Sequence, residues 1–98
     1  MSEETFGFAP PPFKPEDALV QIRRALRDLK LAERGMAYEL RGRRVVELGA
    51  DGTAVQARIA RKPALTPEWD RLQVASAAEQ RKLIDELKKR LARWEREE

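Results

Sequence analysis

Four basic residues in the first third of the chain are spaced so that they could contact phosphate groups. They are Arg23, Arg27, Lys30 and Arg34. On an α-helix, at about 100° per residue, such a spacing places all four in one narrow row. A row of this kind could neutralise nucleic-acid phosphates or an acidic partner. Three further cations, Arg41, Arg43 and Arg44, would extend the row if the chain turns back toward the helix.

The residue types that most catalysis needs are missing. The chain has no histidine and no cysteine, which removes the commonest general base and the best nucleophile. Zinc, copper and iron sites rely on the same side chains. The run Gly49-Ala50-Asp51-Gly52 has neither the Lys-Ser/Thr ending of a phosphate loop nor the alternating carboxylates of a calcium loop. We therefore predict that the chain is not an enzyme and has no cofactor and no metal site.

A second candidate surface is an apolar seam near the C-terminus, formed by Leu87, Leu91 and Trp94. A tryptophan and leucines on one exposed helix face are typical anchors of a protein interface. If the helix projects past the rest of the fold, the seam needs a partner, most simply a second copy. If the helix packs alongside the first helix, the same seam is internal core. The sequence leaves both alternatives open.

The elements that position these residues begin with a long helix predicted over Pro15–Arg34. Proline at the first helical position, followed by Glu16 and Asp17 in the first turn, is a typical start signal. Apolar residues recur every three or four positions and give one buried stripe. Gly35 stands where a left-handed C-terminal cap belongs.

Three short strands are predicted next. Residues 36–41, 45–48 and 55–60 alternate apolar and polar side chains, as strands with one covered face do. Gly42 supplies the first turn, and the Asp51-Gly52 pair is a strong hairpin signal for the second.

Two helices are predicted to close the chain. Thr66-Pro67-Glu68 is the pattern of a helix cap and first turn, so we expect a short helix through Val74. Ser76-Ala77-Ala78-Glu79 matches a capping box and opens the last helix. The predicted fold is α+β, in α-β-β-β-α-α order, with a three-stranded antiparallel meander and the helices packed on one face.

Length and composition set the remaining expectations. A chain of 98 residues fits one domain, which we expect over residues 15–98 after a flexible proline-rich tail over residues 1–14. In that tail Phe6, Phe8 and Phe13 flank Pro10-Pro11-Pro12. The phenyl rings either pack back onto the domain or form a linear motif for an aromatic groove. No apolar run is long enough to span a bilayer. Because the chain also lacks cysteine, we expect no membrane association and a cytoplasmic location.

Two functions of different classes follow from these patterns. The preferred one is a small non-enzymatic protein-interaction module, with an unidentified protein partner or self-association through the C-terminal helix. The alternative is a nucleic-acid-binding domain that uses the basic row. Residues 18–62 carry eleven basic and five acidic residues, so the positive field belongs to the first helix and the predicted hairpins.

Overall fold

The first helix, α1 (Pro15–Asp28), begins where the sequence predicts and ends six residues earlier than expected. The computed structural model describes residues 12–97. Ala18, Ile22 and Leu26 form the buried face of α1. The helix ends in a Schellman motif, in which the Lys30 N–H bonds to the Arg27 carbonyl and the Leu31 N–H to the Leu26 carbonyl. Lys30 takes the left-handed position, with φ 70°, that the sequence assigned to Gly35.

A short hairpin occupies the segment predicted as the end of this helix. Strand β1 (Ala32–Arg34) pairs antiparallel with β2 (Ala37–Leu40), so the predicted helix over Pro15–Arg34 is too long. Gly35 has a φ of 63° and supplies the turn between them. Leu31 is buried just before β1. Burying Leu31 and Tyr38 against α1 requires the chain to reverse here, and a continued helix would carry Leu31 away from the core.

The sheet has five strands in the order β1-β2-β3-β4-β5, and every neighbouring pair is antiparallel. The central strands are β3 (Arg43–Ala50) and β4 (Val55–Ala60). The α+β class and the meander are as predicted, but the three-stranded count and the α-β-β-β-α-α order are not. The observed order is α-β-β-β-β-β-α.

The fifth strand, β5 (Trp69–Val74), replaces the short helix predicted over this segment. Its pairing with β4 sets Val74 opposite Val55 and Leu72 opposite Ala57. Backbone pairing starts earlier, where the Arg61 N–H donates to the Glu68 carbonyl at 2.9 Å. The local helix-start pattern is overridden because β4 would otherwise leave a long run of backbone groups unpaired at the sheet edge.

The face of the sheet turned away from the helices is polar. Arg58 forms an ion pair with Glu47 across β3 and β4. Its guanidinium lies over the Trp69 ring, 4.9 Å from the ring centroid, a cation–π contact. Arg44 also reaches Glu47 at 3.3 Å. Contacts between β3, β4 and β5 and within β3 therefore hold the side chains of this face, which presents no row of exposed aromatic rings.

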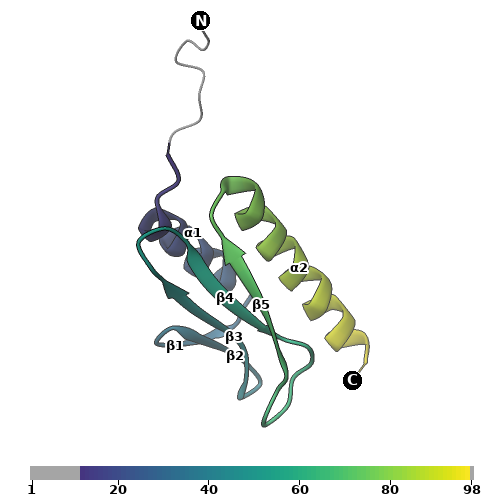
Figure 1. Ribbon diagram of the computed structural model, residues 1–98. Coiled ribbons are helices and arrows are strands. Elements are labelled where there is room, and N and C mark those ends of the chain that lie inside the picture. Colours follow the sequence, from purple (N-terminus) through teal and green to yellow (C-terminus); the bar gives the residue numbers. More distant parts are fainter. Residues whose placement is uncertain (1–11, 98) are drawn as a thin grey trace, which may run out of the picture.

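The last helix, α2 (Ala77–Arg96), is as predicted. The Ser76 side chain accepts a hydrogen bond from the Glu79 N–H, and the Glu79 side chain accepts one from the Ala75 N–H. Figure 1 shows α1 and α2 on the same side of the sheet. There α1 packs against β3 and β4, and α2 packs against β5 and α1. The core lies between these layers and is centred on buried residues such as Ile22, Tyr38 and Leu83.

The proline-rich segment falls largely outside the described residues, as do Phe6 and Phe8. Of its aromatic residues the structure describes Phe13, which is half-buried and packs against the core. Among residues 12–97, no helix combines the length and the apolar character that crossing a bilayer requires.

Candidate functional site

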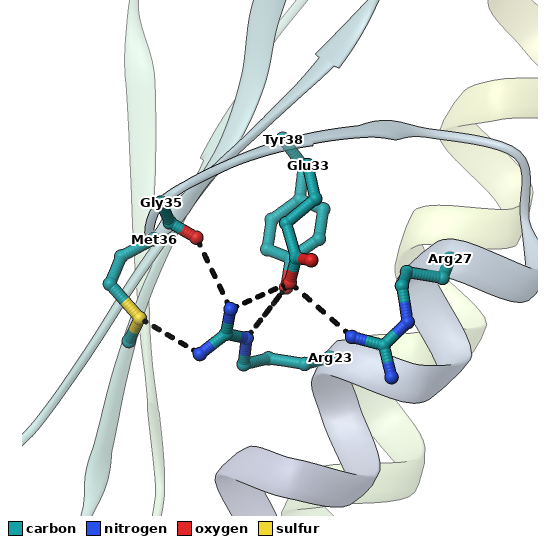
Figure 2. Close-up of polar contacts among 6 residues, drawn as sticks. All are labelled: Arg23, Arg27, Glu33, Gly35, Met36 and Tyr38. Carbon is teal, nitrogen blue, oxygen red and sulfur yellow. Dashed lines mark hydrogen bonds and ion pairs between the residues drawn. The ribbon is translucent and has the colours of Figure 1, made fainter.

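Arg23, the first member of the predicted basic row, is engaged within the chain (Figure 2). Its Nη2 and Nε atoms donate to Glu33 Oε2 at 2.7 and 3.0 Å. The Tyr38 hydroxyl donates to the same carboxylate oxygen at 2.7 Å, and Arg27 Nη1 lies 3.4 Å from it. A second bond from Arg23 Nη2 reaches the Gly35 carbonyl at 3.5 Å. These contacts fasten the β1–β2 hairpin to α1, which indicates a structural role for Arg23.

The same contacts shift the ionisation of the cluster. The hydrogen bonds from Tyr38 and then Arg23 hold the pKa of the Glu33 carboxyl below its usual value. Burial, reinforced by the bond to Glu33, raises the pKa of the Tyr38 phenol. At neutral pH the cluster is therefore a carboxylate, a guanidinium and a neutral phenol.

Titration of Tyr38 tests this cluster. It is the single tyrosine of the chain, so near-ultraviolet absorbance should follow it alone, with a midpoint above the ordinary value of about 10. Its contribution to stability is fully present below pH about 10 and is lost as pH rises through the raised pKa. Glu33→Gln should move the midpoint down toward the ordinary value, whereas Glu39→Gln should leave it in place. Equal midpoints in the two variants would contradict the cluster.

The remaining members of the basic row do not share the helix. Lys30 follows the end of α1, and Arg34 lies on β1, where its Nε atom is 3.6 Å from Glu39 Oε1. The prediction of one continuous row on the first helix is therefore wrong. The physical reason is that α1 ends early, so the residues after position 29 no longer follow the helix and do not lie in line with Arg23 and Arg27. Arg41, Arg43 and Arg44 are all exposed around the turn that joins β2 to β3.

The apolar seam of α2 faces mostly inward. Leu87 is fully buried and Trp94 is 2% exposed, and both belong to the core. Leu91 is half-buried and packs against the core from outside. Of the two alternatives that the sequence left open, internal packing therefore describes Leu87 and Trp94. Leu91 is the member of the seam that keeps an accessible surface.

Leu91 shares a hollow with two of the predicted cations. This basic hollow has a volume of about 410 Å³ and lies between the end of α1, the β2–β3 turn and α2. Its lining residues are Leu29, Lys30, Leu40, Arg41, Lys88, Leu91, Ala92 and Glu95. Three half-buried leucines, one from each element, form the apolar part. The lining includes three cations and one carboxylate, so the hollow is basic. Its three leucines form an apolar floor.

The backbone at this hollow carries an unusual conformation. Arg41-Gly42 is a two-residue hairpin turn with φ values of 53° and 82°, the geometry that favours Asn-Gly. Lys30 holds the helix-end position that most often belongs to glycine. A left-handed conformation costs a residue with a side chain about 1–2 kcal/mol. Within residues 12–97, Lys30 and Lys88 form no ion pair with any other described residue.

The sequence predicts Lys30 and Arg41 as parts of one basic surface and Leu91 as part of a separate apolar seam. It did not find Leu29, Leu40 or Lys88 as neighbours of those residues, and no local signal distinguishes these three from ordinary core or surface positions. Among residues 12–97 the structure also holds no cluster of carboxylates that could bind a metal ion. Comparison with protein families, with curated proteins and with solved structures finds no match to the chain.

Proposed function

We propose that the chain is a small, non-enzymatic, cytoplasmic protein-interaction module that binds an apolar side chain of a partner protein in the basic hollow. The observation that carries this proposal is the convergence of Leu29, Leu40 and Leu91 from three elements on one concave surface. Concave apolar surfaces bordered by a few polar groups are the usual form of a binding site. Glu95 is the single carboxylate of the hollow, and with no histidine or cysteine in the chain this supports binding over catalysis.

The partner should engage Leu91 and its neighbours, and the rest of the seam should not take part. Leu87 and Trp94 lie in the core of their own chain, so self-association through the whole seam would require the fold to open. Leu91 offers its accessible side to the same hollow as Lys30 and Arg41. Leu91, the predicted protein-interaction anchor, thus lies on the same surface as two of the predicted cations.

Photo-crosslinking in the cells that express the chain tests the proposal. Benzoylphenylalanine in place of Ala92, which lines the hollow and is exposed, should give a defined protein adduct. The matched control is the same group in place of Ala78, which is exposed on α2 and does not line the hollow. Leu91→Ser, checked for folding by circular dichroism, should abolish the adduct. Equal labelling from both positions, or none from position 92, would refute the proposal, and an adduct with a second copy would identify self-association.

Nucleic-acid binding is the second candidate function. What supports it is the exposure of Arg41, Arg43 and Arg44 around one hairpin turn, with exposed Lys62 in the β4–β5 loop at the same end of the molecule (Figure 1). Phosphate contacts of this kind give an affinity that falls steeply with salt. Such a ligand would bind over the rim of the hollow and would leave its leucines facing water.

A further inference from the structure

The sheet has one long free edge. Strand β5 is the last strand in the order and pairs with β4 alone. The opposite edge strand, β1, has three residues, whereas β5 has six. A long exposed edge invites pairing with another chain, so proteins usually shorten such edges or cover them. β5 is therefore the edge at which a strand of another chain could add.

The register of β5 decides which of its backbone groups face this edge. The Arg61 N–H bonds to the Glu68 carbonyl at 2.9 Å, and these two residues continue the β4–β5 pairing by one step. Hydrogen-bonded pairs alternate along an antiparallel ladder, so the even-numbered residues of β5 bond to β4. The N–H and C=O groups of Trp69, Arg71 and Gln73 point away from β4. Within residues 12–97 these groups have no hydrogen-bond partner.

A groove of about 560 Å³ follows this edge between β5 and α2, which run side by side (Figure 1). This edge groove is lined by Asp70, Arg71 and Leu72 of β5 and by residues of α2 between positions 82 and 90. Side chains of neighbouring strand residues point to opposite faces of a sheet. A groove that touches all three strand residues must therefore pass along the edge itself. Its lining residues and those of the basic hollow are different.

The available charges of the edge groove are mostly positive. Arg90 pairs with Glu86 at 2.7 Å and with Asp70 at 2.8 Å, so these two acids are neutralised within the chain. Three exposed cations of the groove form no ion pair with any other described residue, namely Arg71, Lys82 and Lys89. Asp85 is the one lining acid that, among residues 12–97, is likewise unpaired. Three available cations thus outweigh one available carboxylate.

We propose that the edge groove binds an extended, acidic segment of a partner protein, which pairs with the free edge of β5 as a sixth strand. Backbone hydrogen bonds to Trp69, Arg71 and Gln73 supply affinity, as in other cases of strand addition. Carboxylates of the segment face Arg71, Lys82 and Lys89 and give the selectivity. A second copy of this chain would bring the same cations to the edge, and like charges across a strand pair oppose pairing. The edge groove is therefore a second interaction surface, independent of the basic hollow.

Amide hydrogen exchange of the full chain tests the free edge and its use. Without a ligand, the amides of Arg71 and Gln73 should exchange quickly because they face water. Those of Asp70 and Leu72 should exchange slowly because they bond to β4. A bound strand should slow exchange at Arg71 and Gln73 and leave the other two as they were. Equal protection of all four amides in the free chain would remove the free edge and overturn the inference.

The probe is a capped octapeptide of alternating threonine and glutamate, titrated at low and near-physiological salt and followed by amide nuclear magnetic resonance. Threonine favours the extended conformation. One control peptide is N-methylated at its internal amides, which keeps every charge and removes the donors. A second control has lysine in place of glutamate. Both controls should bind about tenfold more weakly than the probe. Equal binding of the N-methylated peptide, or no binding of the probe, would overturn strand addition, and stronger, salt-steep shifts with duplex DNA at the same amides would replace it by nucleic-acid binding.

Gln73→Pro removes one donor from the free edge without changing the charge. Proline is accepted at an edge position whose N–H faces solvent, so the fold should persist, as circular dichroism checks. Binding of the probe should weaken about fivefold, the effect of one lost hydrogen bond. Gln73→Thr keeps the N–H and is the matched control, which should bind as the parent chain does. Equal binding by the folded Gln73→Pro and Gln73→Thr chains would contradict the proposal.

Charge variants test the selectivity separately. Lys82→Gln and Lys89→Gln should each weaken binding of the probe about threefold at low salt, the size of one exposed charge contact. Arg81→Gln is the matched control, since Arg81 is an exposed cation of α2 outside the edge groove, and it should change nothing. Equal weakening in all three variants would show attraction to the net charge of the chain and overturn the proposed site. The crosslink from position 92 should persist in every one of these variants, because that position lines the basic hollow.

Discussion

Replacing Trp94 by alanine should lower the free energy of unfolding by about 3–5 kcal/mol, the usual cost of deleting a buried aromatic side chain. Trp94 is 2% exposed and belongs to the core cluster that joins α2 to the rest of the fold. For a domain of this size, whose total stability is expected to be about 5–15 kcal/mol, such a loss brings the chain close to unfolding. Urea denaturation followed by circular dichroism measures the change.

Two further variants test whether the loss comes from the buried apolar volume of Trp94. Trp94→Phe keeps most of the apolar volume and should cost much less, because among the described residues the Trp94 Nε1–H has no hydrogen-bond acceptor and its loss removes an unpaired donor. Leu91→Ala, at the half-buried neighbour, should cost less than Trp94→Ala. If Trp94→Ala left the monomer as stable as the parent chain and instead dissociated an oligomer in sedimentation velocity, Trp94 would be an interface residue after all.

The second large effect is expected at Arg90, which ties α2 to the sheet. Its guanidinium donates to the Ala60 carbonyl at 3.0 Å, to Asp70 Oδ2 at 2.8 Å and to Glu86 Oε2 at 2.7 Å. The Arg90 side chain is 12% exposed. Arg90→Ala should lower the free energy of unfolding by about 2–3 kcal/mol, because it takes a charged donor from the Ala60 carbonyl, Asp70 and Glu86. Asp70 would keep its hydrogen bond from Arg61 Nε, at 3.0 Å.

Arg93→Ala is the matched control for Arg90, since Arg93 is an exposed arginine one turn along the same helix. It should change stability by less than about 0.5 kcal/mol. Arg90→Lys should recover part of the loss, because lysine supplies the charge and cannot reach three acceptors in the same fork geometry. Equal stability of Arg90→Ala and Arg93→Ala would show that the contacts of Arg90 contribute no net free energy.

Local signals were sufficient where each element is specified by its own residues. The start of α2 is fixed by the Ser76 hydroxyl, which accepts from the Glu79 N–H, and by the Glu79 side chain, which accepts from the Ala75 N–H. Pro15 and the acids after it fix the start of α1. The turn between β3 and β4 is held by Asp51, whose Oδ1 accepts from the Thr53 and Ala54 N–H groups. These bonds lower the pKa of Asp51 to about 2. All of these contacts lie within a few residues in the chain, so the two helix starts and the position of this turn were predictable from the sequence, although the Asp51 bonds to Thr53 and Ala54 were not predicted.

Local signals failed where a distant strand decides the conformation. Thr66-Pro67-Glu68 has the pattern of a helix start, yet Trp69–Val74 pairs with β4. Residues 32–34 continue the helical periodicity, yet Glu33 turns toward Tyr38 and Arg23. In both cases the gain comes from backbone pairing or from a charged hydrogen-bond network that forms only when the chain is folded. Propensity within the segment cannot show such a gain.

By itself, then, the sequence determined the α+β class, the first turn of α1, the central strands and the whole of α2, because each depends on neighbours a few residues apart. It also determined the residue types that argue against common catalysis. Only the tertiary structure decided that Arg23 is engaged by Glu33, that Leu87 and Trp94 are core, and that Lys30, Arg41 and Leu91 border one hollow. The physical reason is that these contacts join α1, the β2–β3 turn and α2, whose spacing in the chain says nothing of their distance in space.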